Sequence, residues 1–386
     1  MYSDGYSIRD YGAMVNDEAR FRPFAEALKR RVTAGSVVLD IGAGTGILSF
    51  LACKFGARKV YAVEPDASIE VAKLCARNIP GSERITWIQD LSTRITLPEP
   101  ADLVIGDLHG SMPFYTGNIA SLADARTRHL KPGGRMLPQR DLLLAAPAQS
   151  SKEFSYIESP WQSNAFGLDL SAGLPWVTST LTRAQSAPIA PEQLLAAPQQ
   201  WGVIDYAAGA ADRADATLEW TIERAGTLHG LYLWFDGVVD DGLGFSNSPL
   251  LPELVYGRNF APLERAFDVV VGDRIHCRLA VNRVRNDYIY RWETRIEGTD
   301  GTVKGNFRQT SFRLPPSQAD VLRKMATDYT PNLDQDGQIR REALLAMDGQ
   351  RSLGDIAELL LTRFPDWLKD RQSALDIAAD LSKRHG

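Results

Sequence analysis

The sequence predicts an α/β protein in which a doubly wound, mostly parallel sheet precedes an antiparallel β-domain and a small helical module. Strand and helix patterns alternate from Val37 to about Leu137, which is typical of a parallel sheet. Alternating strands separated by Gly, Asp and Asn turns follow, and helical periodicity returns beyond Pro316. We therefore expect three domains, covering residues 1–138, 139–316 and 317–386.

The alternating region starts with an apolar strand that enters a glycine-spaced turn and then a helix. In order, its expected elements are a strand at Val37–Leu39, a helix through Leu48–Phe55, a strand at Lys59–Val63, a helix at Ser68–Asn78 and strands at Ile85–Ile88 and Asp102–Ile105. This order predicts a doubly wound sheet.

The antiparallel region is interrupted by an Ala- and Pro-rich stretch between Ser179 and Gln200, which we interpret as an arm or long insertion. Its spacing of strands favours a barrel or a sandwich, with examples at Leu218–Glu223, Leu231–Phe235, Phe267–Val271, His276–Val281 and Tyr288–Thr294. The last domain shows helical patterns at Ser317–Met325, Ile339–Met347, Ser352–Arg363 and Ser373–Arg384.

Composition narrows the class of protein. With 44% hydrophobic and 24% charged residues over 386 positions, the chain is typical of a soluble globular protein. A formal net charge of −5 gives no sign of a general nucleic-acid binder, so we expect small-molecule or protein partners. The N-terminus carries no signal-peptide pattern and no segment is apolar enough to cross a membrane, so we expect a cytoplasmic protein.

The most informative segment is the turn that contains Gly42, Gly44 and Gly46, directly after Asp40. Glycines let the backbone bend tightly and approach a ligand, and they place free amides at the start of the next helix. Glu64 ends the next strand 22 residues after Gly42, where a carboxylate suits a ribose diol. This G-x-G-x-G spacing departs from the dinucleotide pattern and looks like the S-adenosylmethionine (SAM) site of class I methyltransferases.

With these residues in place, about the first 315 positions resemble the protein arginine methyltransferases. The helix Met-Val-Asn-Asp-Glu-Ala-Arg, with Met14, Asp17 and Arg20, is similar to the family's helix before the glycine loop. Further similar segments are Gly44–Ser49, Gly56–Glu64, Phe166–Ser171, Pro191–Leu195 and Phe245–Pro249. The resemblance implies a Rossmann-like, seven-stranded methyltransferase domain, a β-barrel, a dimerisation arm at about 157–200 and a homodimer.

The same resemblance implies SAM as the cofactor and no metal. The residues expected to bind SAM are Met14, Arg20, Asp40, Gly42, Gly44, Gly46, Glu64 and Asp90. Arg20 is expected to pair with the cofactor carboxylate, with a surface helix position as its alternative. Asp90 is a candidate acceptor for the adenine amino group, and an exposed turn aspartate is the competing interpretation.

The family's substrate clamp departs from its pattern here. Its two glutamates, nine residues apart, correspond to Asp107 and Thr116, and its Thr-His-Trp loop appears as Leu254-Val255-Tyr256. A guanidinium is best held by paired carboxylates, which a threonine hydroxyl cannot replace, and Asn118 adds only a neutral amide. The sequence therefore predicts an acceptor other than a typical protein arginine.

Asp107 and His109 are the candidate catalytic residues, because the fourth strand ends at the edge of the sheet where ligands usually bind. His109 is expected to take a proton from the acceptor, while Asp107 orients that acceptor or the imidazole. The alternative for His109 is a solvated loop residue. Tyr256, at the place of the family's tryptophan, either walls the acceptor pocket or packs between domains.

Three hypotheses on function remain. The first is SAM-dependent methyl transfer to a nitrogen or oxygen of a peptide or small biosynthetic intermediate. The second is protein arginine N-methylation with a clamp rebuilt around Asp107, and the third is a SAM- or peptide-binding scaffold without catalysis. The helical tail from Ala346 to Ala357 resembles small PqqD-type modules that present peptides to enzymes, and a helical cap on the barrel is its alternative.

Overall fold

The computed structural model describes residues 6–164, 166–184, 188–209, 212–284, 287–312, 323–324 and 327–385. The chain forms two compact units, Met1–Pro315 and Pro316–Gly386. The parallel and antiparallel regions thus belong to one unit, and the C-terminal helices form the other.

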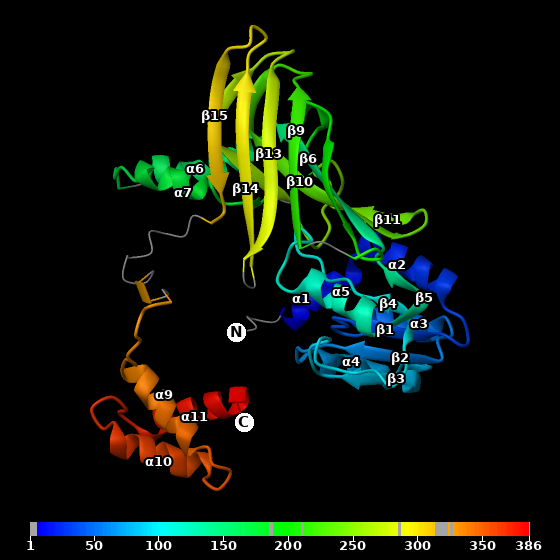
Figure 1. Cartoon of the computed structure of the whole chain (residues 1–386), viewed down its shortest axis with the longest axis vertical. Helices are drawn as coiled ribbons and strands as arrows, with labels where there is room; N and C mark the ends of the chain where they lie inside the picture. The colour runs from blue at the N-terminus through cyan, green and yellow to red at the C-terminus, as the bar shows by residue number, and fades with distance from the viewer. Residues whose placement is uncertain are drawn as a thin grey trace. The chain divides into compact units, whose positions relative to one another are not determined.

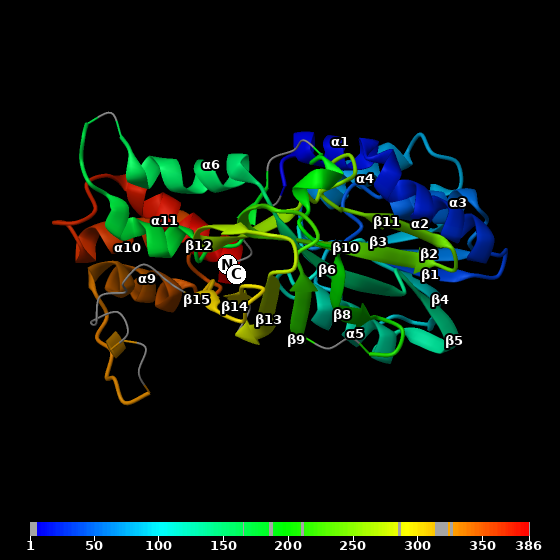
Figure 2. The ribbon, with the colours of Figure 1, turned by 90° about the horizontal axis from the view of Figure 1, so that it is seen from above.

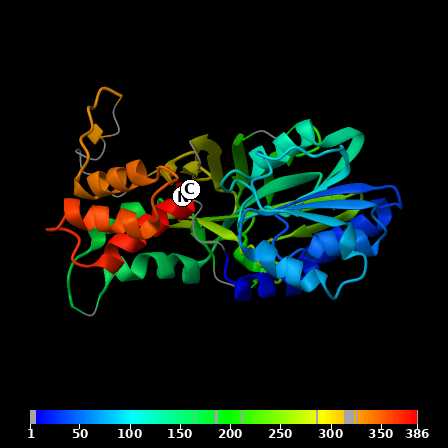
Figure 3. The ribbon, with the colours of Figure 1, turned by 90° about the horizontal axis from the view of Figure 1, so that it is seen from below.

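A parallel sheet organises the first part of the larger unit, with strand order β3-β2-β1-β4-β5. Its strands are β1 (Val37–Ile41), β2 (Lys59–Val63), β3 (Ile85–Ile88), β4 (Ala101–Ile105) and β5 (Leu130–Leu137), and a 3₁₀ turn, η1 (Ser82–Arg84), precedes β3. Figures 2 and 3 show α3 (Ile47–Lys54) and α4 (Ser68–Ala76) on one face and α5 (Asn118–Arg128) on the other. Because both faces are covered, all five residues of the central strand β1 are buried.

This sheet confirms the predicted doubly wound architecture but has five strands in the part of the chain that the structure describes, not the seven expected. The difference has a topological cause. After β5 the chain turns at Pro138 and Gln139 into β6 (Arg140–Ala148), which pairs with β10 and β8 in an antiparallel sheet instead of extending the parallel one.

The predicted antiparallel domain follows, and its described strands form two separate sheets (Figure 1). One has the order β7-β12-β10-β6-β8 with β11 beside β10, and the other has the order β15-β14-β13-β9. Their strands are β7 (Thr182–Arg183), β8 (Gln199–Asp205), β9 (Arg213–Thr221), β10 (Gly226–Asp240), β11 (Leu243–Ser246), β12 (Asn259–Val269), β13 (Arg274–Val284), β14 (Asp287–Glu297) and β15 (Val303–Thr310). Alternating burial along β14 shows why they pack face to face: every second side chain from Tyr288 to Ile296 is buried, and all of these except Thr294 are hydrophobic.

The expected arm is a mostly helical segment between β6 and β8. It contains α6 (Ser151–Gln162), η2 (Ser171–Gly173), α7 (Leu174–Val177), β7 and η3 (Pro191–Gln193). Three apolar side chains close together on it are exposed, Phe166 by 86%, Leu168 by 60% and Leu170 by 42%, in addition to Tyr156 and Trp161 on α6. The arm therefore presents an apolar surface within the part of the chain that the structure describes.

Two helices precede the parallel sheet. In α1 (Ile8–Asn16), Ser7 and Asp10 form a capping box, and in α2 (Glu18–Arg31), the Asp17 side chain accepts a hydrogen bond from the Arg20 amide. The helix α2 also contacts β10 and β11 of the antiparallel region. It therefore belongs to both halves of the unit.

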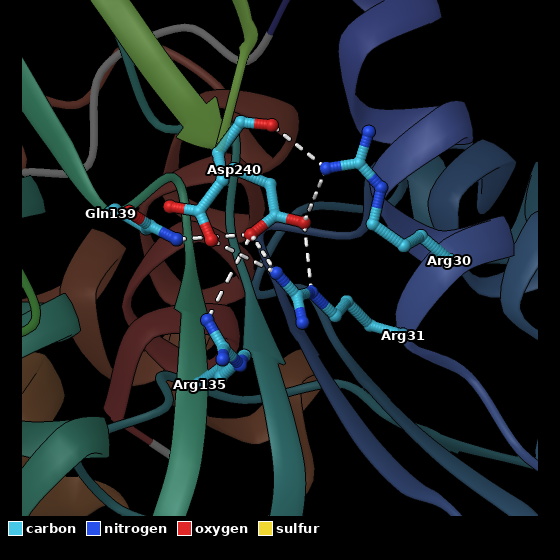
Figure 4. Close-up of polar contacts among 6 residues, drawn as sticks. Arg30, Arg31, Arg135, Gln139 and Asp240 are labelled. Atoms are coloured by element: carbon cyan, nitrogen blue, oxygen red, sulfur yellow. Dashed lines mark hydrogen bonds and ion pairs between the residues drawn. The ribbon is translucent and has the colours of Figure 1, made fainter.

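An ionic cluster fixes the C-terminal end of α2. Asp240, fully buried at the end of β10, accepts hydrogen bonds from Arg31 Nε at 2.8 Å and Nη2 at 2.9 Å, and from Gln139 Nε2 at 3.0 Å (Figure 4). Arg30 and Arg135 lie 3.5 and 3.9 Å from the same carboxylate. A buried carboxylate is stable here because a bidentate guanidinium and an amide share its charge.

The smaller unit contains α9 (Gln335–Ala346), α10 (Leu353–Arg363) and α11 (Arg371–His385) around an alanine-rich core. Ser352 and Asp355 form a capping box at the start of α10. The helix expected at 317–325 lies outside the described residues except for positions 323 and 324. Among the described residues, no helix is long and apolar enough to span a membrane.

Candidate functional site

The glycine turn after β1 has the left-handed backbone that its sequence predicts. Gly42, Gly44 and Gly46 have φ values of 68°, 52° and 88°, and a Cβ on Gly42 would lie 2.3 Å from Leu108 Cδ2. A Cβ on Gly44 would lie 2.8 Å from a ring carbon of Tyr11. Side chains are thus excluded both by conformation and by space.

Two carboxylates flank this turn. Glu64 accepts hydrogen bonds from the amides of Gly44 at 2.9 Å and Asp66 at 2.8 Å, while burial holds its pKa above the ordinary value. Asp40 accepts a hydrogen bond from Ser49 Oγ at 2.6 Å, and its other oxygen has no partner among the described residues. Burial raises the pKa of Asp40 to about 7, although the Ser49 hydrogen bond opposes the shift.

Tyr11 covers the glycine turn and was not singled out from the sequence. Its hydroxyl accepts a hydrogen bond from Ser68 Oγ at 3.1 Å, which links α1 to the start of α4. The available signal is its spacing: Tyr11 and Met14 are three residues apart and share one face of α1. Asp90, the adenine candidate, is partly exposed after β3 and accepts a hydrogen bond from the Leu91 amide.

A cavity of about 940 Å³ opens between α1, α2, the loop after β4 and the loop before β12. The glycines of the turn, Asp40, Glu64 and Asp90 are not among its described lining residues. Its walls include four residues predicted for the site, Met14, Arg20, Asp107 and His109, together with Tyr256. The structure therefore brings the expected cofactor helix and the expected catalytic loop to one cavity. Its size is in the range of small-molecule sites.

Asp107 has three partners in the wall of this cavity. Arg20 Nη1 and the Tyr256 hydroxyl both donate hydrogen bonds to its carboxylate, and His109 Nδ1 lies 2.9 Å from Oδ1. Burial alone would raise the pKa of Asp107, but the Arg20 charge and the bonds from His109 and Tyr256 hold it at about 2. Asp107 is a carboxylate whose charge is already balanced by protein groups.

His109 lies between two carboxylates, because its Nε2 is 3.0 Å from Asp141 Oδ2. Tyr206 donates a hydrogen bond of 2.6 Å to the same Asp141 oxygen. Burial alone would lower the pKa of His109, but the charges and hydrogen bonds of Asp141 and Asp107 raise it to about 10. The imidazole is therefore protonated at neutral pH, with both nitrogens engaged.

This geometry does not fit the proton-accepting role expected for His109, because an imidazolium has no lone pair to accept a proton. It also differs from the solvated loop histidine considered as the alternative. The ring is enclosed by Phe235, Phe245 and Tyr256, with centroids 5.0, 5.6 and 5.5 Å away. His109 is better described as a buried cation that positions Asp107.

The second clamp position lies outside this cavity. Thr116 is exposed, has a φ of 46° and donates a hydrogen bond to Asn118 Oδ1 at 3.1 Å. Asn118 in turn donates to the Leu108 carbonyl, which ties the ends of the loop together. A positive φ is unusual for a β-branched residue and marks this loop as strained.

Sequence reasoning missed Asp141 and Tyr206, although both touch the His109 network. The one available signal is that Asp141, beside Arg140 at the start of β6, directly precedes the apolar run from Leu142 to Ala148. A charged residue in such a strand points to a buried partner. Tyr206 follows β8 and gives no signal of its own.

The chain is similar to known methyltransferases over most of the larger unit. A model of the ribosomal protein L11 methyltransferase (PrmA) family matches residues 25–138. A probable histone-arginine methyltransferase 1.4 of Arabidopsis thaliana is 32% identical over 284 residues, 69% of this chain and 53% of that protein. A probable histone-arginine methyltransferase CARM1 of Oryza sativa subsp. indica is 30% identical over 295 residues, 72% and 55% respectively. The chain spans about half the length of these curated relatives.

Solved structures of arginine methyltransferases share the fold. Arabidopsis thaliana protein arginine methyltransferase 10 has a TM-score of 0.68 at 21% identity, covering 79% of this chain and 97% of that one. The Trypanosoma brucei PRMT1 enzyme-prozyme complex with AdoHcy has a TM-score of 0.70 at 19% identity, covering 78% and 96%. The predicted resemblance is thereby confirmed: the chain is a protein arginine methyltransferase-like protein with the class I SAM-dependent methyltransferase fold.

Proposed function

We propose that this chain is a SAM-dependent methyltransferase that methylates a nitrogen of a protein or peptide. The observation that carries the proposal is the glycine turn, with three left-handed glycines between the buried carboxylates Asp40 and Glu64, in a fold shared with methyltransferases. SAM supplies a methyl group on a positively charged sulfur. The protein then has to position an acceptor atom in a water-excluded cavity.

The cofactor is proposed to lie along the glycine turn and α1. The turn fits it because added side chains are excluded there and because Asp40 keeps one oxygen without a partner among the described residues. The residues proposed to hold it are Met14, Arg20, Asp40, Gly42, Gly44, Gly46, Glu64 and Asp90, with Tyr11 added from the structure. Exchange of hydrogen bonds by Arg20 and Glu64 would accompany binding, since both already have protein partners.

Protein arginine is the acceptor that the comparisons support best, ahead of the non-arginine acceptor that the sequence favoured. The relatives that match most of the larger unit carry arginine methyltransferase names. The cavity also has acidic residues at its rim: Glu253 lines it and lies 3.5 Å from Arg183. A weak, partly exposed ion pair of this kind can be exchanged for a substrate guanidinium.

A second candidate, an uncharged acceptor in a peptide or small intermediate, is favoured by one observation. Asp107 has three partners, and the formal charges of Arg20, Asp107, His109 and Asp141 cancel. A guanidinium that enters this wall therefore meets no unpaired carboxylate at Asp107, whereas an amine, imidazole or hydroxyl in its neutral form needs none.

One experiment separates these acceptors. The protein is incubated with methyl-labelled SAM and a glycine-arginine-rich peptide, the same peptide with lysine for arginine, or cell extract, and products are identified by mass spectrometry. Label on peptide arginine establishes the first candidate, and Glu253→Gln should then raise KM for that peptide. Label on an atom other than arginine nitrogen in an extract component establishes the second. Binding of S-adenosylhomocysteine (SAH) with no labelled product in any arm would leave the scaffold hypothesis and overturn both.

We also propose a homodimer formed through the arm. The exposed side chains of Phe166, Leu168 and Leu170 support it, because monomeric proteins rarely expose such clusters. Light scattering should give a dimer mass for the wild-type protein and a monomer mass after Phe166→Ser and Leu168→Ser are combined. A wild-type monomer at high concentration would contradict the proposal.

A further inference from the structure

A second cavity, of about 440 Å³, shares part of its wall with the candidate acceptor cavity. Ser111 and Tyr115, in the loop after β4, line both. The remaining walls come from the arm, from the facing ends of β13 and β14, and from the residues after β15. The two cavities therefore meet at a single loop.

The shared wall is fixed by the antiparallel region. Ser111 Oγ donates a hydrogen bond of 3.0 Å to Asn259 Oδ1, and its carbonyl accepts one of 3.0 Å from Asn247 Nδ2. Both asparagines are buried. Because the loop is bonded at these points, the spacing between the two cavities is set by the fold.

Rings dominate the second cavity. Phe114 and Tyr288 pack with ring centroids 5.4 Å apart, Tyr290 is buried beside them, and the rim is formed by Tyr115 and Phe312. Phe312 is 56% and Tyr115 47% exposed, so aromatic surface faces solvent at the entrance. Aromatic rings prefer offset or edge-on contact with other rings, and a bound ring would cover this surface.

The polar groups of the cavity limit what can bind. Asp287 is the one charged residue among its described lining residues, so an anionic ligand is disfavoured. Asn259 is 3% exposed, and its Nδ2 has no hydrogen-bond partner among the residues that the structure describes. A ligand that brings a carbonyl or hydroxyl oxygen would satisfy this donor.

We propose that the second cavity is a subsite for an aromatic side chain of the acceptor substrate, carried close in sequence to the methylated residue. The proposal rests on the proposed function, because it takes the acceptor to be a peptide. Occupation of this subsite would select substrates by a residue that is not itself modified. The subsite would bind the substrate where Asp107 cannot, because Arg20 and His109 already balance the Asp107 charge.

The test uses N-acetyl-4-fluorophenylalanine amide as the probe and fluorine NMR of the full-length protein. The wild-type protein should broaden and shift the probe signal. Phe312→Ala should weaken binding by roughly threefold to tenfold, the usual effect of losing one ring contact. Trp367→Ala is the matched control, because it removes a similarly exposed ring (59% against 56%) from the smaller unit, outside the described lining of the cavity, and it should leave binding unchanged.

Three results would overturn the proposal. They are an unchanged fluorine signal of the probe, equal binding of the probe to the two variants, and binding of the probe to the unfolded protein only. The measurement needs neither SAM nor turnover. Probe binding without any methylated product would therefore leave the subsite intact and remove the proposed function. Methylated product with no probe binding would leave the proposed function intact and remove the subsite.

Discussion

Asp141 and His109 come from different halves of the larger unit, yet Asp141 Oδ2 lies 3.0 Å from His109 Nε2. Asp141 belongs to β6 of the antiparallel region, and His109 to the loop after β4 of the parallel sheet. His109 also contacts Asp107. Through His109, a residue of β6 therefore influences the charge around the Asp107 carboxylate in the candidate acceptor cavity.

Replacing Asp141 with asparagine should destabilise the protein by about 3–5 kcal/mol, because it leaves a buried imidazole with one carboxylate partner instead of two. Urea unfolding gives the free energy, and nitrogen NMR of the histidine side chain should show His109 losing its proton at lower pH than in the wild type. Tyr206→Phe is the control, since it removes one hydrogen bond to the Asp141 carboxylate but leaves the charge beside His109, and it should cost about 1.5–3 kcal/mol. Equal losses in the two variants would contradict the prediction.

The stabilisation from His109 should depend on pH in a defined direction. Its pKa in the folded protein, about 10, lies above the ordinary 6.5, so protonation stabilises the fold fully below pH 6.5 and ceases to do so as pH rises through 10. The difference in unfolding free energy between wild type and His109→Gln should therefore be large at pH 6.5 and small at pH 10. A difference that stays constant over this range would show that packing, not charge, is responsible.

Asp40→Asn should stabilise the protein while weakening its ligand binding. The pKa of Asp40 is raised from 3.8 to about 7, so the charged form costs stability that grows as pH rises between these values. The variant should be more stable than the wild type by on the order of 4 kcal/mol at pH 8 and equal to it near pH 4. Calorimetry should show SAH binding at least about tenfold weaker, which is near 1.4 kcal/mol. Unchanged SAH affinity would remove Asp40 from the site.

Gly44→Ala should abolish SAH binding, because the added Cβ meets the Tyr11 ring in a left-handed backbone conformation. The expected cost in unfolding free energy is about 1–2 kcal/mol. Gly35→Ala is the control, since a Cβ there meets nothing within 4 Å. If both variants bind SAH equally, the glycine turn does not hold the cofactor.

Thr116→Asn should stabilise the protein by about 1 kcal/mol, because asparagine adopts a φ of 46° with less strain than a β-branched residue. Thermal unfolding measures the gain. Thr299 lies in an exposed turn without a positive φ, so Thr299→Asn should change stability by less than about 0.5 kcal/mol. A loss of stability at Thr116 would mean that its hydroxyl contact to Asn118 outweighs the strain.

The sequence predicted those parts of the fold that depend on local pattern. Apolar strands alternating with helices gave the parallel sheet, and the spacing of Gly42, Gly44 and Gly46 gave the left-handed turn, because both follow from residues close together in the chain. The sheet was expected to have seven strands and has five among the described residues. Where the chain leaves a sheet depends on which strand it pairs with next, and β6 pairs with β10, about 90 residues away.

The protonation of the candidate site was less predictable, because it too depends on contacts between residues far apart in the chain. Asp107 and His109 line one cavity, but His109 is protonated and not the expected proton acceptor, because Asp141 contacts it only through long-range packing. No local sequence pattern indicates that the pKa of a loop histidine such as His109 is raised to about 10. The exposure of Thr116 likewise follows from the loop's tie to Leu108 and not from its spacing.

The helix α2 connects the candidate site to the ionic cluster around Asp240. Arg20, near its start, contacts Asp107, and Arg31, at its end, is held by buried Asp240. The eleven helical steps from Arg20 to Arg31 span about 16 Å. A shift of the antiparallel sheets relative to the parallel one would thus pull on Arg20 through α2, and an exchange of partners at Arg20 would push on Asp240. We therefore expect ligand binding at Arg20 to be coupled to the orientation of the antiparallel sheets relative to the parallel sheet.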